Sequence, residues 1–124
     1  MIALFKTATK KDIKPETGLT DTDPDNNAVK CRNCLKEITH ENFKIEKNGS
    51  HIHSFANPYG YIFTIRCFSG APGAVTTGDS SSEFSWFADY SWKICGCSRC
   101  MSHIGWKFFS GDSSFYGLIS DKIF

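Results

Sequence analysis

Two pairs of cysteines constrain the fold of this chain more than any other feature. "CRNC" contains Cys31 and Cys34, "CSRC" contains Cys97 and Cys100, and 62 residues separate the pairs. A C-x-x-C turn brings two thiolates together, and two such turns complete the tetrahedral shell that zinc prefers. We therefore predict one structural Zn²⁺, held by all four cysteines, with no open position for chemistry.

The other two cysteines, Cys67 and Cys95, are weaker candidates for the metal. We prefer Cys97 to Cys95 as the ligand, because Cys97 and Cys100 repeat the C-x-x-C spacing of the first pair. Cys67 follows Phe63 and Ile65 at strand spacing, which indicates a core position. The apolar run before Lys6 is too short for the core of a signal peptide, so we expect a cytoplasmic protein whose cysteines bind metal or stay reduced.

Short segments rich in β-branched and aromatic residues alternate with turn signals after residue 28. They are "HIHSF", "YGYIFTIRCF", "WKIC", "HIGWKFF" and "FYGLI". No window has a convincing helical period, so we predict an all-β domain over residues 29–124, mostly antiparallel, in which zinc ties an early hairpin to a late one. Residues 1–28 are expected to form a flexible polar tail. We expect a mobile rim over 69–82, which contains no aromatic residue.

The charge of the chain excludes some classes of partner. Its 124 residues carry a formal net charge of +1, and the sequence pI is about 7.6. A surface that binds nucleic acid or an anionic membrane normally has a clear basic excess, and no run of eighteen apolar residues exists. We therefore expect neither partner, and a ligand that is small or neutral.

All three tryptophans, Trp86, Trp92 and Trp106, fall within 21 residues. They could simply fill the core, since one tryptophan buries roughly 150–250 Å². However, small polar residues, among them Glu83 and Ser85, alternate with the aromatic residues. Flat rings mixed with small polar groups suit a concave site that holds a flat ligand and pairs its polar edge.

These motifs together resemble the thalidomide-binding domain of cereblon, also called the CULT domain. The likeness rests on "EFSWFADYSW", "CSRCMSHIGWKF" and "FYGLI", with five and thirteen residues between successive tryptophans. "NPYGYIF" and "CRNC" fall where that family has its Asn-Pro loop and its other two zinc ligands. From about Val29 to the C-terminus, the resemblance implies a β-tent, two antiparallel sheets pinned by zinc, in a single-domain form similar to that of bacteria.

The resemblance also implies a ligand class, cyclic imides: the glutarimide of thalidomide-type drugs, and protein C-termini cyclised to a glutarimide or succinimide. The three tryptophans would wall the site. The backbone carbonyl of Phe84 would accept a hydrogen bond from the imide N–H, and the backbone N–H of Trp86 would donate to an imide carbonyl. The remaining implied roles are Phe108 at the back, Phe63 as a further wall, Asn57 and Pro58 at the entrance, and Glu83 as support.

Some residues depart from the animal members of the family. Those carry histidine at the positions of Phe84 and Tyr59, so one side-chain hydrogen bond to the imide is missing here, whereas the backbone pair is kept. We expect no region for binding a ligase adaptor in this chain. Because a uracil ring presents the same carbonyl, N–H, carbonyl edge as a glutarimide, uridine is expected to be a weak ligand.

Two other functions stay open. An aromatic cage could hold a quaternary ammonium or methyl-lysine, with Glu83 or Asp89 as the carboxylate. A methionine sulfoxide reductase of the B type would instead use Cys67 or Cys95 as a nucleophile, with His103 near it in sequence. We find no nucleophile, base and orienting group together, and we therefore predict binding without catalysis.

Overall fold

The computed structural model describes residues 27–124, and over this range the chain is built from strands. Residues 1–26, most of the predicted tail, lie outside the described residues. Two short 3₁₀ helices accompany the strands: η2 (Glu41–Phe43) lies between β2 and β3, and η3 (Ser120–Lys122) follows β8. The strands are β1 (Ala28–Lys30), β2 (Glu37–His40), β3 (Ile52–Ala56), β4 (Ile62–Phe68), β5 (Ala74–Ser81), β6 (Ser91–Cys97), β7 (His103–Ser110) and β8 (Ser113–Ile119).

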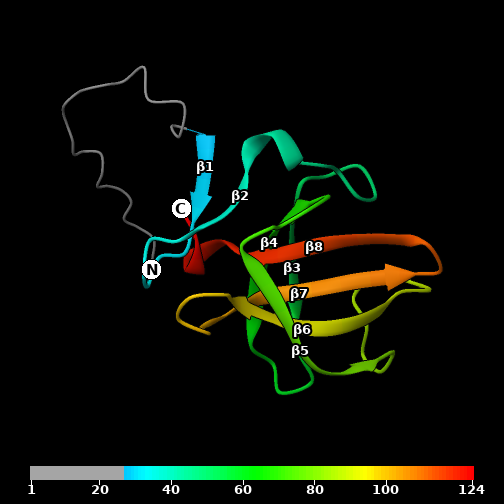
Figure 1. The fold of residues 1–124 in the computed structure, drawn as a ribbon. Coiled ribbons are helices and arrows are strands. Elements are labelled where there is room, and N and C mark those ends of the chain that lie inside the picture. The colour runs from blue at the N-terminus through cyan, green and yellow to red at the C-terminus, as the bar shows by residue number, and fades with distance from the viewer. Residues whose placement is uncertain (1–26) are drawn as a thin grey trace.

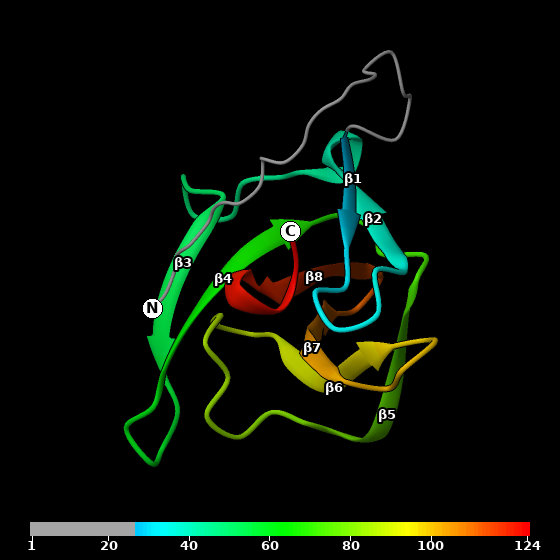
Figure 2. The same cartoon turned by 90° about the vertical axis from the view of Figure 1, so that its left-hand side faces the viewer.

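The strands form two antiparallel sheets. Six of them pair in the order β3-β4-β8-β7-β6-β5, and β1 pairs with β2. The larger sheet curves, so that β3 and β4 lie on one side and β5 and β6 on the other, with β8 and β7 between them (Figures 1 and 2). The predicted all-β fold of two antiparallel sheets is thus confirmed.

The small β1–β2 sheet covers one end of the large sheet, beside the C-terminus (Figure 2). Cys31 forms an isolated bridge with Ile123, and the Lys30 N–H donates to the Phe124 carbonyl at 2.7 Å. The Gly73 N–H donates to the Ile38 carbonyl at 2.8 Å. The bonds of Lys30 and Cys31 thus join β1 to the C-terminus, and the bond of Gly73 joins β2 to the segment before β5.

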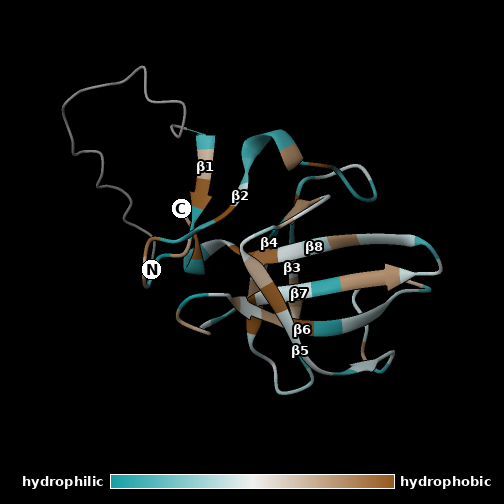
Figure 3. Ribbon diagram, viewed as in Figure 1, coloured by the Kyte–Doolittle hydropathy of each residue, from teal (hydrophilic) through white to brown (hydrophobic). Residues whose placement is uncertain are grey.

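The apolar residues of the strands, brown in Figure 3, pack into two clusters. The first surrounds the cysteine pairs and includes Phe68, Ile104 and Leu118. The second includes Phe108 and Phe115, and in it Ile65, Cys67 and Phe63 of β4 come together, as their strand spacing predicted. The cysteine pairs and the aromatic residues around Phe108 therefore belong to separate cores.

Residues 74–81, which belong to the segment 69–82 where we expect a mobile rim, form the strand β5. Ala74, Val75, Thr76 and Thr77 pair in register with β6, and the register then shifts before Ser81 pairs with Trp92. The strand has no aromatic residue because it is the exposed edge of the sheet, where backbone hydrogen bonds to β6 rather than buried side chains hold it.

Candidate functional site

The four cysteines of the C-x-x-C pairs form one cluster. Their sulfur atoms all lie within 4.8 Å of one another. Cys31 Sγ is 3.6 Å from Cys100 Sγ, and Cys34 Sγ is 3.5 Å from Cys97 Sγ, so the contacts run between the two turns. Four thiols at this separation could hold one metal ion.

The two cysteine turns have the same backbone geometry. The Leu35 N–H donates to the Cys31 carbonyl, and the Met101 N–H donates to the Cys97 carbonyl, both at 2.8 Å. Leu35 and Met101 both have positive φ, 69° and 64°. Hydrogen bonding with the side chains of Asn33 and Ser102 lowers the pKa of Cys100 to about 5, which favours the thiolate form that ligates metals.

The structure brings Cys97, and not Cys95, into the cysteine cluster, as the sequence analysis preferred. A register shift between Cys95 and Gly96 marks a bulge there, and Cys95 is buried in the first core. Burial raises the pKa of Cys95 to about 12 and that of Cys67 to about 11. Such thiols are protonated near neutral pH, so this environment does not favour either one as a reductase nucleophile.

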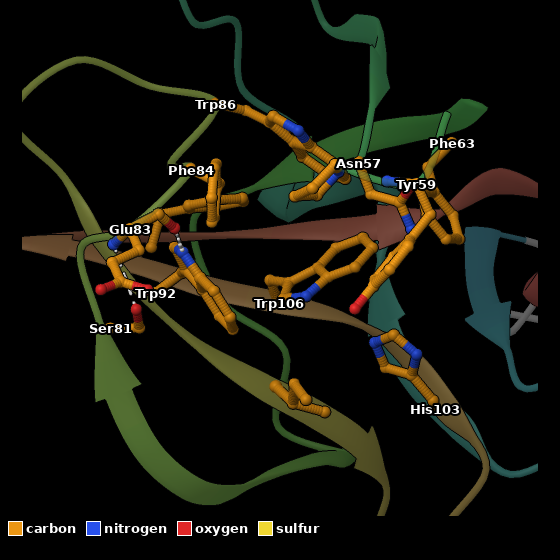
Figure 4. Close-up of a pocket in the computed structure, with 13 residues that line it drawn as sticks. Asn57, Tyr59, Phe63, Ser81, Glu83, Phe84, Trp86, Trp92, His103 and Trp106 are labelled. Atoms are coloured by element: carbon orange, nitrogen blue, oxygen red, sulfur yellow. Dashed lines mark hydrogen bonds between the residues drawn. The ribbon is translucent and has the colours of Figure 1, made fainter. Parts of the chain in front are cut away.

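A cavity of about 690 Å³ opens at the other end of the domain. Its wall is formed by residues of the β3–β4 loop, of strands β4, β5, β6 and β7, and of residues 82–90, which we call the cavity segment (Figure 4). The cavity segment leaves β5, crosses toward the β3–β4 side and returns to β6 (Figure 2). The residues that line the cavity are Asn57, Pro58, Tyr59, Phe63, Ser81, Glu83, Phe84, Trp86, Trp92, Ile94, His103, Trp106 and Phe108.

The aromatic rings of the cavity stand at steep angles to one another. The ring centroids of Trp86 and Trp106 are 4.7 Å apart with an interplanar angle of 75°, and those of Phe63 and Trp106 are 5.2 Å apart at 80°. Trp86 also stacks on Phe55 at 5.0 Å and 12°. Edge-to-face contacts such as those of Trp86 and Phe63 with Trp106 are a preferred geometry of aromatic pairs.

Hydrogen bonds fix two of the indoles to distant backbone. Trp86 Nε1 donates to the Ala56 carbonyl at 3.0 Å, which ties the cavity segment to the end of β3. Trp92 Nε1 donates to the Glu83 carbonyl at 2.8 Å, which ties β6 to the cavity segment. Both polar atoms of these walls are thereby satisfied, and the rings present mainly carbon to the cavity.

The backbone between Phe84 and Trp86 is unusual. Phe84 has φ 57°, in the left-handed region, and its side chain is 71% exposed. Within residues 27–124, neither the backbone carbonyl of Phe84 nor the backbone N–H of Trp86 has a hydrogen-bond partner. One backbone acceptor and one backbone donor, two residues apart on residues that line the cavity, thus have no partner within residues 27–124.

Nine of the ten residues predicted for ligand binding line this cavity; the exception is Ser85. The Ser85 hydroxyl donates to the Phe87 carbonyl at 3.0 Å, and the side chain stabilises the cavity segment from outside the cavity. The sequence analysis missed Ile94, which alternation from Trp92 could have indicated, and Ser81, which depends on the pairing of β5. It also left out Tyr59 and His103; the His103 ring packs edge-on against Trp106 at 4.9 Å.

Comparison with known proteins supports the resemblance drawn from the motifs. Cereblon of Drosophila erecta is 37% identical over 84 residues, cereblon of Danio rerio 36% over 81 residues, and cereblon of Drosophila persimilis 33% over 104 residues. The chain is a homologue of cereblon. The matches cover 63–75% of the chain and fit the thalidomide-binding (CULT) domain of cereblon.

The chain spans less than a fifth of these cereblons, 14%, 19% and 16% of their lengths. No family model matches the chain. Across residues 27–124, no helix is long and apolar enough to cross a membrane.

Proposed function

We propose that this cereblon-like domain binds cyclic imides in the aromatic cavity and does not act on them chemically. The observation that carries the proposal is the free Phe84 carbonyl and Trp86 N–H beside the rings of Trp86, Trp92 and Trp106. An imide offers an N–H flanked by two carbonyls, which matches one acceptor and one donor on the same wall. The rings would cover the apolar methylene groups of a glutarimide.

A glutarimide is small, and its affinity is limited accordingly. With about eight heavy atoms, even the best small ligands gain no more than about 1.5 kcal/mol per atom, and ordinary efficiencies give micromolar binding. Even with modest affinity, the cavity should distinguish clearly between a cyclic imide and an open-chain amide. An open-chain amide cannot present the same three-group edge and would leave a wall group unpaired, which costs roughly 1–3 kcal/mol.

We further propose that the metal of the cysteine cluster is one structural Zn²⁺. All four candidate ligands are thiols, the donor set typical of closed zinc sites. The ion would join the two turns that carry Cys31 and Cys100, far from each other in sequence and close in space. It would act on folding and not on the ligand.

A cation cage is the second candidate because one carboxylate, Glu83, lines the cavity. A quaternary ammonium could lie against the tryptophan faces with Glu83 nearby. Such binding would weaken as salt is added, whereas binding of a neutral imide would not. The free backbone pair at Phe84 and Trp86 favours the imide, because an ammonium without N–H groups cannot use it.

The test is calorimetric titration of the zinc-loaded chain with glutarimide, open-chain glutaramide and trimethyllysine at two salt concentrations. We expect saturable binding of glutarimide alone, weakened more than about ten-fold in Trp86→Ala, with no salt dependence. Phe124→Ala serves as the matched control, since this exposed aromatic lies outside the cavity. Binding of trimethyllysine alone would establish the cation cage, and silence for all three ligands would refute both proposals.

A further inference from the structure

A lysine outside the cavity contacts the rings that hold the cavity segment. Lys47 Nζ lies 5.2 Å from the ring centroid of Tyr90, 4.9 Å from that of Phe115, and 3.2 Å from Tyr90 Oη. Lys47 is half-buried, and no carboxylate within residues 27–124 pairs with it. Two ring faces and one phenol oxygen are therefore the groups that this cation contacts.

The backbone of Lys47 lies at the start of a hydrogen-bonded hairpin turn. Its N–H and carbonyl pair with the carbonyl and N–H of Ser50, at 2.9 and 3.1 Å. The two residues between them, Asn48 and Gly49, have φ of 52° and 86°, as a two-residue hairpin turn requires. The Ile45 N–H donates to the Cys67 carbonyl at 3.0 Å, which anchors this hairpin to β4. The backbone that carries the Lys47 side chain is thus hydrogen-bonded within the turn and to β4.

The cavity segment, in contrast, contains strained backbone. Phe84 and Asp89 both adopt positive φ, 57° and 69°, although neither is glycine. Within the cavity segment, Phe87 accepts hydrogen bonds from the Tyr90 N–H and the Ser85 hydroxyl. Residues in the left-handed region persist only where the surroundings over-determine them. Contacts at the ends of the cavity segment should therefore influence how fully it is ordered.

Tyr90, the last residue of the cavity segment, connects this segment to the hairpin of Lys47. Its ring packs against Phe115 at 5.4 Å, and Phe115 in turn packs against Phe87 at 5.0 Å. The hydrogen bond with Lys47 lowers the pKa of the Tyr90 phenol, as expected for an ammonium that donates to its oxygen. A continuous set of contacts thus runs from Lys47 to the residues that carry the cavity wall.

We propose that Lys47 is a positioning residue for the cavity: its ammonium holds Tyr90 against Phe115 and so keeps the cavity segment in its ligand-competent conformation. The effect on ligand affinity rests on the proposed imide binding. The effect on local order does not, because it follows from the contacts of Lys47 alone. When the competent conformation is only fractionally populated, apparent affinity falls by that fraction.

The test compares Lys47→Met, which keeps an apolar stem without the charge, with Lys47→Arg, which keeps the cation. Amide hydrogen exchange is measured across the zinc-loaded chain, and glutarimide affinity is measured by calorimetry. Lys107→Met is the matched control, because Lys107 Nζ also lies over a tyrosine ring, that of Tyr116 at 5.7 Å, but does not touch the cavity segment.

For Lys47→Met we expect exchange within residues 82–90 to rise about three- to ten-fold, the range of a partly buried cation–π contact. Exchange in β7, which Lys47 does not contact, should stay unchanged, glutarimide should bind at least about three-fold more weakly, and Lys47→Arg should restore most of both effects. The Lys107→Met variant should change neither quantity.

Three results would overturn the proposal: unchanged exchange in 82–90, a uniform rise across all strands, or a local rise with glutarimide affinity unaltered. If the unmodified chain binds no glutarimide, the proposed function fails, and the exchange data still decide whether Lys47 orders the cavity segment.

Discussion

Single residues decide how closely the strands of this domain approach. Gly105 on β7 lies opposite Leu118 on β8. A Cβ atom at Gly105 would run into the Gly117 carbonyl oxygen and come within 2.9 Å of Leu118 Cα. Both obstacles are backbone, so no side-chain rotation could relieve the contact, and the two strands would have to separate.

Gly105→Ala should therefore lower the free energy of unfolding by about 1–3 kcal/mol or more. Urea denaturation followed by circular dichroism measures the change. Gly111→Asn is a suitable control: φ at Gly111 is +60°, which asparagine tolerates, and the space around it is open. A loss under about 0.5 kcal/mol is expected there, and equal losses in the two variants would contradict the steric explanation.

At the scale of an element, the cavity segment depends on one buried ring. Phe87 is 2% exposed and packs against four neighbouring rings, those of His53, Phe55, Phe108 and Phe115, at 4.9–5.3 Å. Phe84, three residues earlier, is 71% exposed. The cavity segment is thus attached to the second core through its middle and leaves Phe84 at the cavity wall.

Phe87→Ala should cost about 3–5 kcal/mol of folding free energy, because a buried ring is replaced by a void. Phe84→Ala should change stability by less than about 0.5 kcal/mol, since little surface is buried there. Thermal and urea unfolding of both variants would measure the difference. Comparable losses would mean that the cavity segment is not anchored through Phe87.

At the scale of the whole molecule, the cysteine cluster closes the domain. It lies where β1–β2, the C-terminus and the β6–β7 turn meet, and the first core surrounds it. Structural zinc in small domains provides about 10–16 kcal/mol of apparent binding free energy, comparable with the whole stability of a domain of this size. Loss of the metal should consequently unfold the domain and not merely loosen one end.

A strong zinc chelator should therefore abolish the β-sheet circular dichroism signal, and added zinc should restore it. Metal analysis should find one zinc per chain in the unmodified protein and in Cys67→Ala, but none in Cys100→Ser. A chelated protein that keeps its sheet signal, or a Cys100→Ser variant that retains zinc, would show that the cluster is not the structural site proposed here.

The sequence by itself determined the class of fold and which four of the six cysteines come together. Local patterns were sufficient for both: alternation and β-branched residues marked the strands, and the C-x-x-C spacing repeats the same turn at Cys31 and Cys97. The three tryptophans and the family resemblance also indicated one shared site, and nine of ten candidate residues line one cavity.

Only the tertiary structure decided which way individual groups face. Ser85 turns to the Phe87 carbonyl and away from the cavity, while Ser81 lines it through the pairing of β5. The contact of Lys47 with Tyr90 joins residues 43 positions apart. Alternation and spacing are local properties of a chain, whereas register, strain and long-range contacts arise from packing, so no motif could have indicated them.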